Sequence, residues 1–312
     1  MIAVLLKTLP FFAITFLGFA AVKWRLFEPA GISGISRFVM FLALPALLFT
    51  RLATASAELL LSGRFMLAYM LAVLLTFAGA ALLARYVLRA PPPRAVLYGL
   101  AGTYGNIGFL GLPLITVLVG DELAVPLAMI LTFDLVILVP LSSVALAAGQ
   151  ARTTGAVTGT KTGIGPGLAA LMRNPLMLAI AAGALVSLAR LPVPEPVLEL
   201  SGLLSRAAAP CAMFVVGAVL AGGRTAAHPL PALVMSLIKL AVFPLVVWTV
   251  LSGFGIGGVW LQAAVLGAAM PVAAVVTILA EQHDVLPAQA SMAVLISTLA
   301  SAATIAVALT LV

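Results

Sequence analysis

The chain has 312 residues, of which 64% are hydrophobic and only 8% are charged, and its mean hydropathy is +1.27. A soluble globular domain carries about 25% charged residues, so this composition excludes a soluble protein and indicates an integral membrane protein. The formal net charge of +7 does not indicate nucleic-acid binding, because the basic residues are scattered between apolar runs and form no stripe.

Apolar runs long enough to cross a hydrocarbon core of about 30 Å recur along the whole chain. We predict ten transmembrane helices, at about residues 2–22, 35–52, 65–84, 95–119, 124–148, 175–191, 204–222, 231–252, 259–280 and 288–310. The first run is expected to be a helix and not a signal peptide, because no basic segment precedes it and Lys7 lies within it. The expected fold is therefore an all-α polytopic membrane protein.

The basic residues of the connections are distributed unevenly. The odd-numbered loops hold Lys23, Arg25, Arg85, Arg89, Arg94, Arg152, Lys161, Arg173 and Arg224, whereas the even-numbered loops hold only Arg51, Arg64 and Arg190. Because cytoplasmic loops carry the excess of Lys and Arg, we expect both termini on the extracytoplasmic side.

The two halves of the chain are expected to be repeats. Residues 149–174, rich in Gly and Thr, form a predicted cytoplasmic linker between a first repeat at 1–148 and a second at 175–312. The sequence from Pro45 to Phe49 matches that from Pro210 to Phe214. With five helices in each repeat, an odd number, the second copy must be inverted in the membrane, which is typical of transporters.

The fourth and ninth spans contain sequences that interrupt a helix. The stretch GTYGNIGFLGLP, which ends at Pro113, has a glycine at every third residue, and Pro271 interrupts the ninth span. We expect half-helices that start near Pro113 and Pro271 to direct free amides and positive dipole ends at a shared cavity, which favours an anion. The alternative is a stripe of small residues used only for helix packing.

Residues at these two crossover helices, 4 and 9, are the candidates for a binding site. The predicted substrate-binding set is Gly105, Asn106, Gly108, Pro113, Pro271 and Thr277. Asp134 in the fifth span either carries a coupling proton or is a neutral or hydrogen-bonded acid that fixes this span against the crossover helix. Lys239 in the eighth span is expected to extend its ammonium group toward the membrane surface.

Other functional classes find little support in the sequence. Neither metalloprotease nor serine hydrolase motifs occur, so no enzyme, no catalytic residue, no metal and no cofactor are expected. A cation/proton antiporter on a similar broken-helix fold would need carboxylates near the breaks, and a transporter-like sensor without flux is a third alternative.

Several segments together resemble the auxin efflux carrier family: ALPALLF, GNIGFLGLP, RNP, APCAMFVVGAVLA, KLAVFPL, MPVAAVVTILAEQHD and STLASAATIAVALTLV. They span nearly the whole chain in the family's order. The resemblance implies a scaffold of helices 1, 2, 6 and 7, a mobile transport domain of helices 3–5 and 8–10 that moves as an elevator, and a homodimer. The short central linker resembles that of bacterial members, which implies location in the bacterial inner membrane.

The same resemblance implies the substrate class. Family members carry small organic anions, either auxin-like monocarboxylates or dicarboxylates such as malate and malonate, with H⁺ or Na⁺ as the potential coupling ion. This chain departs from the family where relatives commonly have an asparagine after the proline of the ninth span, because Val275 and Val276 stand there.

Overall fold

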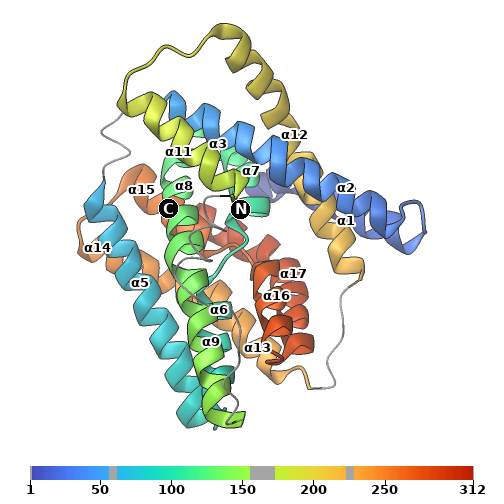
Figure 1. The fold of residues 1–312 in the computed structure, drawn as a ribbon, viewed down its shortest axis with the longest axis vertical. Helices are drawn as coiled ribbons and strands as arrows, with labels where there is room; N and C mark the ends of the chain where they lie inside the picture. The colour runs from blue at the N-terminus through green and yellow to red at the C-terminus, as the bar shows by residue number, and fades with distance from the viewer. Residues whose placement is uncertain (1, 56–61, 155–172, 223–227, 312) are drawn as a thin grey trace. The chain divides into compact units, whose positions relative to one another are not determined.

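The computed structural model describes residues 2–55, 62–154, 173–222 and 228–311 (Figure 1). Within those ranges every regular element is a helix, and the only β-type pairing is one isolated bridge. Helices satisfy their backbone polar groups internally, which hydrocarbon requires. The prediction of an all-α protein is therefore confirmed for the described residues.

Helices occupy all ten predicted ranges, but they differ in length. Six in the described part of the chain are long and apolar enough to cross a membrane: Ala30–Ala53, Gly63–Val87, Asp121–Gly149, Glu195–Ala221, Leu230–Gly253 and Pro287–Leu311. Shorter apolar helices lie at Leu9–Lys23, Ile107–Leu118, Pro175–Leu188 and Gly258–Ala268. The structure therefore supports a multi-pass membrane protein, while ten crossings in inverted repeats stay a prediction.

The described residues form two compact units, of which the first combines Met1–Gly63, Ile107–Thr132 and Met172–Gly222. Its elements are α1 (Ile2–Lys23), α2 (Pro29–Phe38), η1 (Val39–Ala43), α3 (Leu44–Ala53), η3 (Ile107–Gly111), α7 (Leu112–Leu118), η4 (Asp121–Leu123), most of α8 (Ala124–Phe133), α11 (Pro175–Leu188) and α12 (Glu195–Ala221).

Helices α1 and α12 pack closely because glycine lies where they touch (Figure 1). A Cβ atom on Gly18 would lie 2.0 Å from the carbonyl oxygen of Phe214, and one on Gly217 would lie 1.7 Å from that of Thr15. The backbones of the two helices therefore touch at two positions along their length, and any larger residue at either glycine would prevent this contact.

The second unit combines Arg64–Asn106, Phe133–Leu171 and Gly223–Val312. Its elements are α5 (Gly63–Leu82), η2 (Leu83–Val87), α6 (Pro92–Thr103), η5 (Asp134–Leu138), α9 (Val139–Thr154), α13 (Leu230–Leu237), η6 (Ile238–Val242), α14 (Phe243–Gly253), α15 (Gly258–Ala268), α16 (Ala274–Gln282) and α17 (Pro287–Leu311). Helix α6 packs on α9, and α13 and α16 pack on α17.

An aromatic cluster lies in the core of the second unit. The ring centroids of Phe65 and Trp260 are 4.6 Å apart, and the ring of Tyr69 contacts those of Phe65, Phe133 and Phe243. These contacts join α5 to α14 and α15 and to the end of α8.

The predicted linker is partly helical. Helix α9 continues through Gly149 to Thr154, and Asn174 caps α11, its side chain accepting a hydrogen bond of 2.9 Å from the amide of Leu176. The remainder of the predicted linker, residues 155–172, lies outside the described residues.

Candidate substrate site at the paired helix breaks

Both crossover helices are interrupted, as predicted. The first break separates α6, which ends at Thr103, from η3, which begins at Ile107. The second separates α15, which ends at Ala268, from α16, which begins at Ala274. Between these helices Tyr104 and Ala273 are extended, with ψ angles of 105° and 144°.

The two breaks pair with each other as a short antiparallel bridge between Gly105 and Val272. The amide of Asn106 donates to the carbonyl of Pro271 at 2.8 Å, and the amide of Ala273 donates to the carbonyl of Tyr104 at 3.2 Å. Each interrupted segment therefore satisfies backbone groups of the other, which is how non-helical backbone is tolerated at membrane depth. Gly105, Asn106 and Pro271, three of the predicted site residues, lie together here.

A side chain of α17 completes the pairing. The amide of Val272 donates to Oγ of Ser297 at 3.0 Å, and both residues are buried. Ser297 has no marker in the sequence that separates it from other helix serines, and sequence reasoning missed it. Its role depends on the tertiary packing of α17 against α16.

The prediction that a half-helix starts near Pro113 is wrong. Helical structure resumes at Ile107, and Pro113 lies in the first turn of α7, after the π-helical segment η3. A π-helical turn bonds each amide to the fifth preceding carbonyl, so it can rearrange the bonds that proline interrupts. Gly108 and Pro113 belong to the first compact unit, whereas Gly105, Asn106 and Pro271 belong to the second.

Pro271 and Thr277 lie on either side of the start of the second half-helix, α16. Pro271 lies in the break, three residues before Ala274. The first amides of a helix lack intrahelical acceptors, and those of Ala274 and Val275 are in that position at the start of α16. Thr277 lies half-buried in the first turn of the helix. The start of α16 thus offers amides and a positive dipole end beside the break.

The paired breaks, residues 104–106 with 271–273, form what we call the crossing. Lys239 lies there and not at the membrane surface. Its side chain is fully buried, its Nζ donates a hydrogen bond to the carbonyl of Ala268, and its ammonium lies 4.8 Å from the ring centroid of Phe243. A Cβ atom on Gly105 would lie 3.1 Å from Nζ. The expectation that the ammonium group reaches the surface is therefore wrong.

The position of Lys239 has a physical reason. The last carbonyls of α15 have no partners within the helix and form the negative end of its dipole, so an ammonium group stabilises them. The sequence did carry a signal, because Lys239 is the one charged residue between residues 225 and 280. An isolated charge in an apolar span is costly unless it has a partner.

Asp134 is the second buried charged residue of this region. It begins the π-helical segment η5, its side chain has no exposed surface, and neither carboxylate oxygen has a hydrogen-bond partner among the described residues. Lys239, Tyr69 and Tyr104 lie within electrostatic range of the carboxylate. The alternative of a hydrogen-bonded structural acid therefore finds no partner among the described residues, whereas a neutral structural acid and a proton carrier both stay predictions.

The sequence comparisons identify the family. The model of the family described as "Membrane transport protein" matches residues 3–155 and 167–309 of this chain. The chain belongs to this family. It is also 31% identical, over 299 residues, to a protein of Rhizobium meliloti (strain 1021) described as "Putative malonate transporter", and the match covers 95% of this chain and 92% of that protein. The resemblance to auxin efflux carriers is thereby confirmed.

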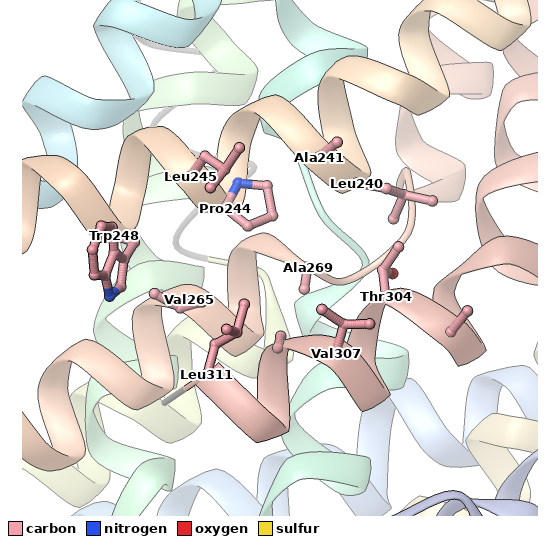
Figure 2. Close-up of a pocket in the computed structure, with 12 residues that line it drawn as sticks. Leu240, Ala241, Pro244, Leu245, Trp248, Val265, Ala269, Thr304, Val307 and Leu311 are labelled. Atoms are coloured by element: carbon pink, nitrogen blue, oxygen red, sulfur yellow. The ribbon is translucent and has the colours of Figure 1, made fainter. Parts of the chain in front are cut away.

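This transporter also has an apolar pocket, of about 500 Å³, beside the crossing (Figure 2). It is lined by α14, α15, α17 and the end of η6, and its residues are Leu240, Ala241, Pro244, Leu245, Trp248, Val265, Ala269, Ala303, Thr304, Val307, Ala308 and Leu311. No charged side chain lines it, and the hydroxyl of Thr304 bonds to the carbonyl of Ser301. An anion would find no counter-charge there, so the paired breaks are the better candidate site.

Proposed function

We propose that this transporter carries a small organic anion, a mono- or dicarboxylate, and binds it at the paired helix breaks. The observation that carries the proposal is the antiparallel bridge between Gly105 and Val272, with a buried ammonium group beside it. Helix ends and a cation attract a carboxylate at a depth where water is scarce. The similarity to a protein described as a malonate transporter supports the same substrate class.

Four residues of the second unit form the proposed contact set. Asn106 is partly exposed, and because its amide already bonds to Pro271, only its side chain is available to a substrate. Gly105 lets a substrate approach the backbone closely, and the carbonyl of Pro271 accepts the hydrogen bond that joins the two breaks. Thr277 adds a hydroxyl beyond the first amides of α16. Gly108 and Pro113 shape the first crossover helix on the other side of its break.

Transport is proposed to proceed by an elevator movement that alternately exposes this site. The proposed scaffold, helices 1, 2, 6 and 7, corresponds to α1, α2 with α3, α11 and α12, all in the first compact unit. Most of the proposed transport domain lies in the second unit, although Ile107–Thr132 groups with the first. Dimerisation through the scaffold rests on the resemblance alone.

Asp134 is proposed to carry a coupling proton. A cation/proton antiporter is the second candidate, and the buried carboxylate of Asp134 favours it because such antiporters need an acid near the breaks. Lys239 argues for the anion carrier, since its charge offsets that carboxylate and reduces the attraction for a cation. In liposomes, Asp134→Asn should bind substrate but lose the dependence of uptake on a pH gradient. Uptake that keeps this dependence would exclude the coupling role.

Uptake of radiolabelled malonate and acetate into proteoliposomes tests the carrier function. Asn106→Ala should weaken binding by about 1.5–3 kcal/mol, the usual contribution of one hydrogen bond to a charged group. Gln282→Ala, which removes an exposed amide at the end of α16, is the matched control. Equal uptake by wild type and empty liposomes would reject anion transport, and unchanged affinity in a folded Asn106→Ala variant would remove Asn106 from the site.

The proposed location is the bacterial inner membrane, with both termini on the extracytoplasmic side. The excess of Lys and Arg in the odd-numbered loops supports this orientation. A reporter fused after Val312 should be active only outside the cytoplasm, and a cytoplasmic signal would require a different number of spans.

A further inference from the structure

Two opposite charges lie buried beside the crossing without forming an ion pair. Asp134 and Lys239 both have fully buried side chains, yet in the described part of the chain the only ion pair within 4.0 Å joins Arg51 to Asp121. The ammonium group of Lys239 instead bonds to the carbonyl of Ala268. The carboxylate of Asp134 therefore interacts electrostatically with Lys239 without forming an ion pair, and it has no hydrogen-bond partner within the described ranges.

The groups that interact electrostatically with Asp134 come from three segments of the second unit. Asp134 is approached by Tyr69 from α5, by Tyr104 from the first break and by Lys239 from η6. The hydroxyl of Tyr69 is also buried without a hydrogen-bond partner among the described residues. Among the described residues, Lys239 is the charged group that acts on the Asp134 carboxylate.

The charge of Lys239 acts at the break itself. Its Nζ would lie 3.1 Å from a Cβ atom on Gly105, the residue directly before Asn106. An anion bound against the break would therefore lie close to a buried ammonium group, with little water to screen the attraction. How strongly the anion is attracted then depends on whether Asp134 offsets that ammonium.

We infer that protonation of Asp134 unmasks the positive charge of Lys239, so that the transporter binds its anion and one proton together. With Asp134 ionised, the two side chains sum to zero charge and the break attracts an anion weakly. With Asp134 protonated, the ammonium group is uncompensated, and the anion supplies the missing negative charge. This inference rests on the proposed anion site and assigns Lys239 as the residue that sets its affinity.

The inference predicts a defined pH dependence. If only the protonated form binds well, the apparent dissociation constant should rise about tenfold per pH unit above the midpoint of Asp134 titration. Binding should also take up one proton per anion, measured with an indicator in weakly buffered detergent solution. Both measurements are made with malonate and with acetate, above the pH range in which these acids themselves titrate.

Three variants distinguish the effects of the two charges on anion binding. Asp134→Asn mimics the protonated acid, so it should bind malonate tightly at every pH without proton uptake. Lys239→Met should bind weakly at every pH. The double variant removes both charges and leaves neither uncompensated, so it should fold and bind weakly. It replaces Lys239→Met as the test of the lysine if that single variant does not fold.

Matched controls remove the same groups elsewhere. Asp284→Asn changes an exposed acid whose φ of 46° an asparagine tolerates, and Lys23→Met changes an exposed lysine at the end of α1. Both should keep the pH dependence of wild type. Binding is measured as the malonate-induced rise in thermal stability, because a ligand of the folded state raises it.

The outcomes separate this inference from the proposed function. If the stabilisation of wild type by each anion is the same at every pH, or if Asp134→Asn keeps the pH dependence, the inference is wrong while the anion site stands. Tight binding by Lys239→Met would also overturn it. If neither anion stabilises any form at any pH, the proposed function fails and the inference fails with it.

Discussion

The amide of Asn106 donates a 2.8 Å hydrogen bond to the carbonyl of Pro271, and this bond joins the two interrupted helices at their breaks. Since the bond uses the backbone of Asn106, its side chain can serve another role. The same pairing means that neither break can shift without disturbing the other. Substitutions at the crossing should therefore affect both helices together.

Gly105→Ala should displace Lys239. The new Cβ atom would lie 3.1 Å from Nζ of Lys239 and 3.3 Å from the carbonyl oxygen of Gly267, so the variant should lose about 1–3 kcal/mol of stability and most of its anion binding. Gly79→Ala, on an exposed face of α5 where a Cβ atom meets nothing within 4 Å, should be neutral or stabilising by about 0.5–1 kcal/mol. Thermal unfolding with and without malonate checks both. Wild-type behaviour of Gly105→Ala would contradict the described position of Lys239.

Ser297→Ala should loosen the second break. It removes the acceptor of the buried amide of Val272, and an unsatisfied buried amide costs about 1–3 kcal/mol. Ser205→Ala is the control, because its hydroxyl bonds only to the carbonyl of Gly202 in its own helix. Thermal stability and malonate affinity should fall in the first variant and not in the second. Equal effects would show that the bond from Val272 contributes nothing specific.

Gly217→Ala should separate α1 from α12. The added Cβ atom would overlap the carbonyl oxygen of Thr15, 1.7 Å away, so we expect a loss of about 3 kcal/mol or more. Gly202→Ala on the same helix meets nothing within 4 Å and should be tolerated. The melting temperature should fall in Gly217→Ala and not in Gly202→Ala, and similar values would contradict the close contact of these helices.

Stability should depend on the protonation of His283, which lies in the connection between α16 and α17. Burial lowers the pKa of its imidazole below the usual value of 6.5, and its Nε2 lies 3.3 Å from Oγ of Ser143. The unfolded chain therefore takes up this proton first as the pH falls. The free energy of unfolding should be fully retained above about pH 6.5 and should decline below it, toward the lower pKa of the folded state.

The control for this pH dependence is the other histidine. His283→Gln should flatten the decline, whereas His228→Gln, at an exposed position, should not change it. A decline that persists unchanged in His283→Gln would assign it to other groups.

The sequence predicted the helices and the presence of two breaks, because apolar length and proline chemistry act locally. It misplaced the first break, since η3 allows Pro113 to enter a helix and moves the interruption to Tyr104 through Asn106. It also misjudged Lys239, because local sequence does not show that α15 presents an unpaired carbonyl to that side chain. The contribution of Ser297 depends in the same way on contacts between distant segments.

Asp134 and Lys239 both lie in π-helical segments, η5 and η6, and η3 directly follows Asn106. A π-helical turn is equivalent to one residue inserted into an α-helix. Deleting a single residue from η5 or η6 would restore a regular α-helix and leave the flanking parts in register, but it would change the direction in which the side chains of the turn point. Such a deletion would leave composition and hydropathy almost unchanged and still turn a buried charge away from the crossing. The number of residues in these turns is thus under as much constraint as their identity, and gene variants with small in-frame deletions there should lose function while still entering the membrane.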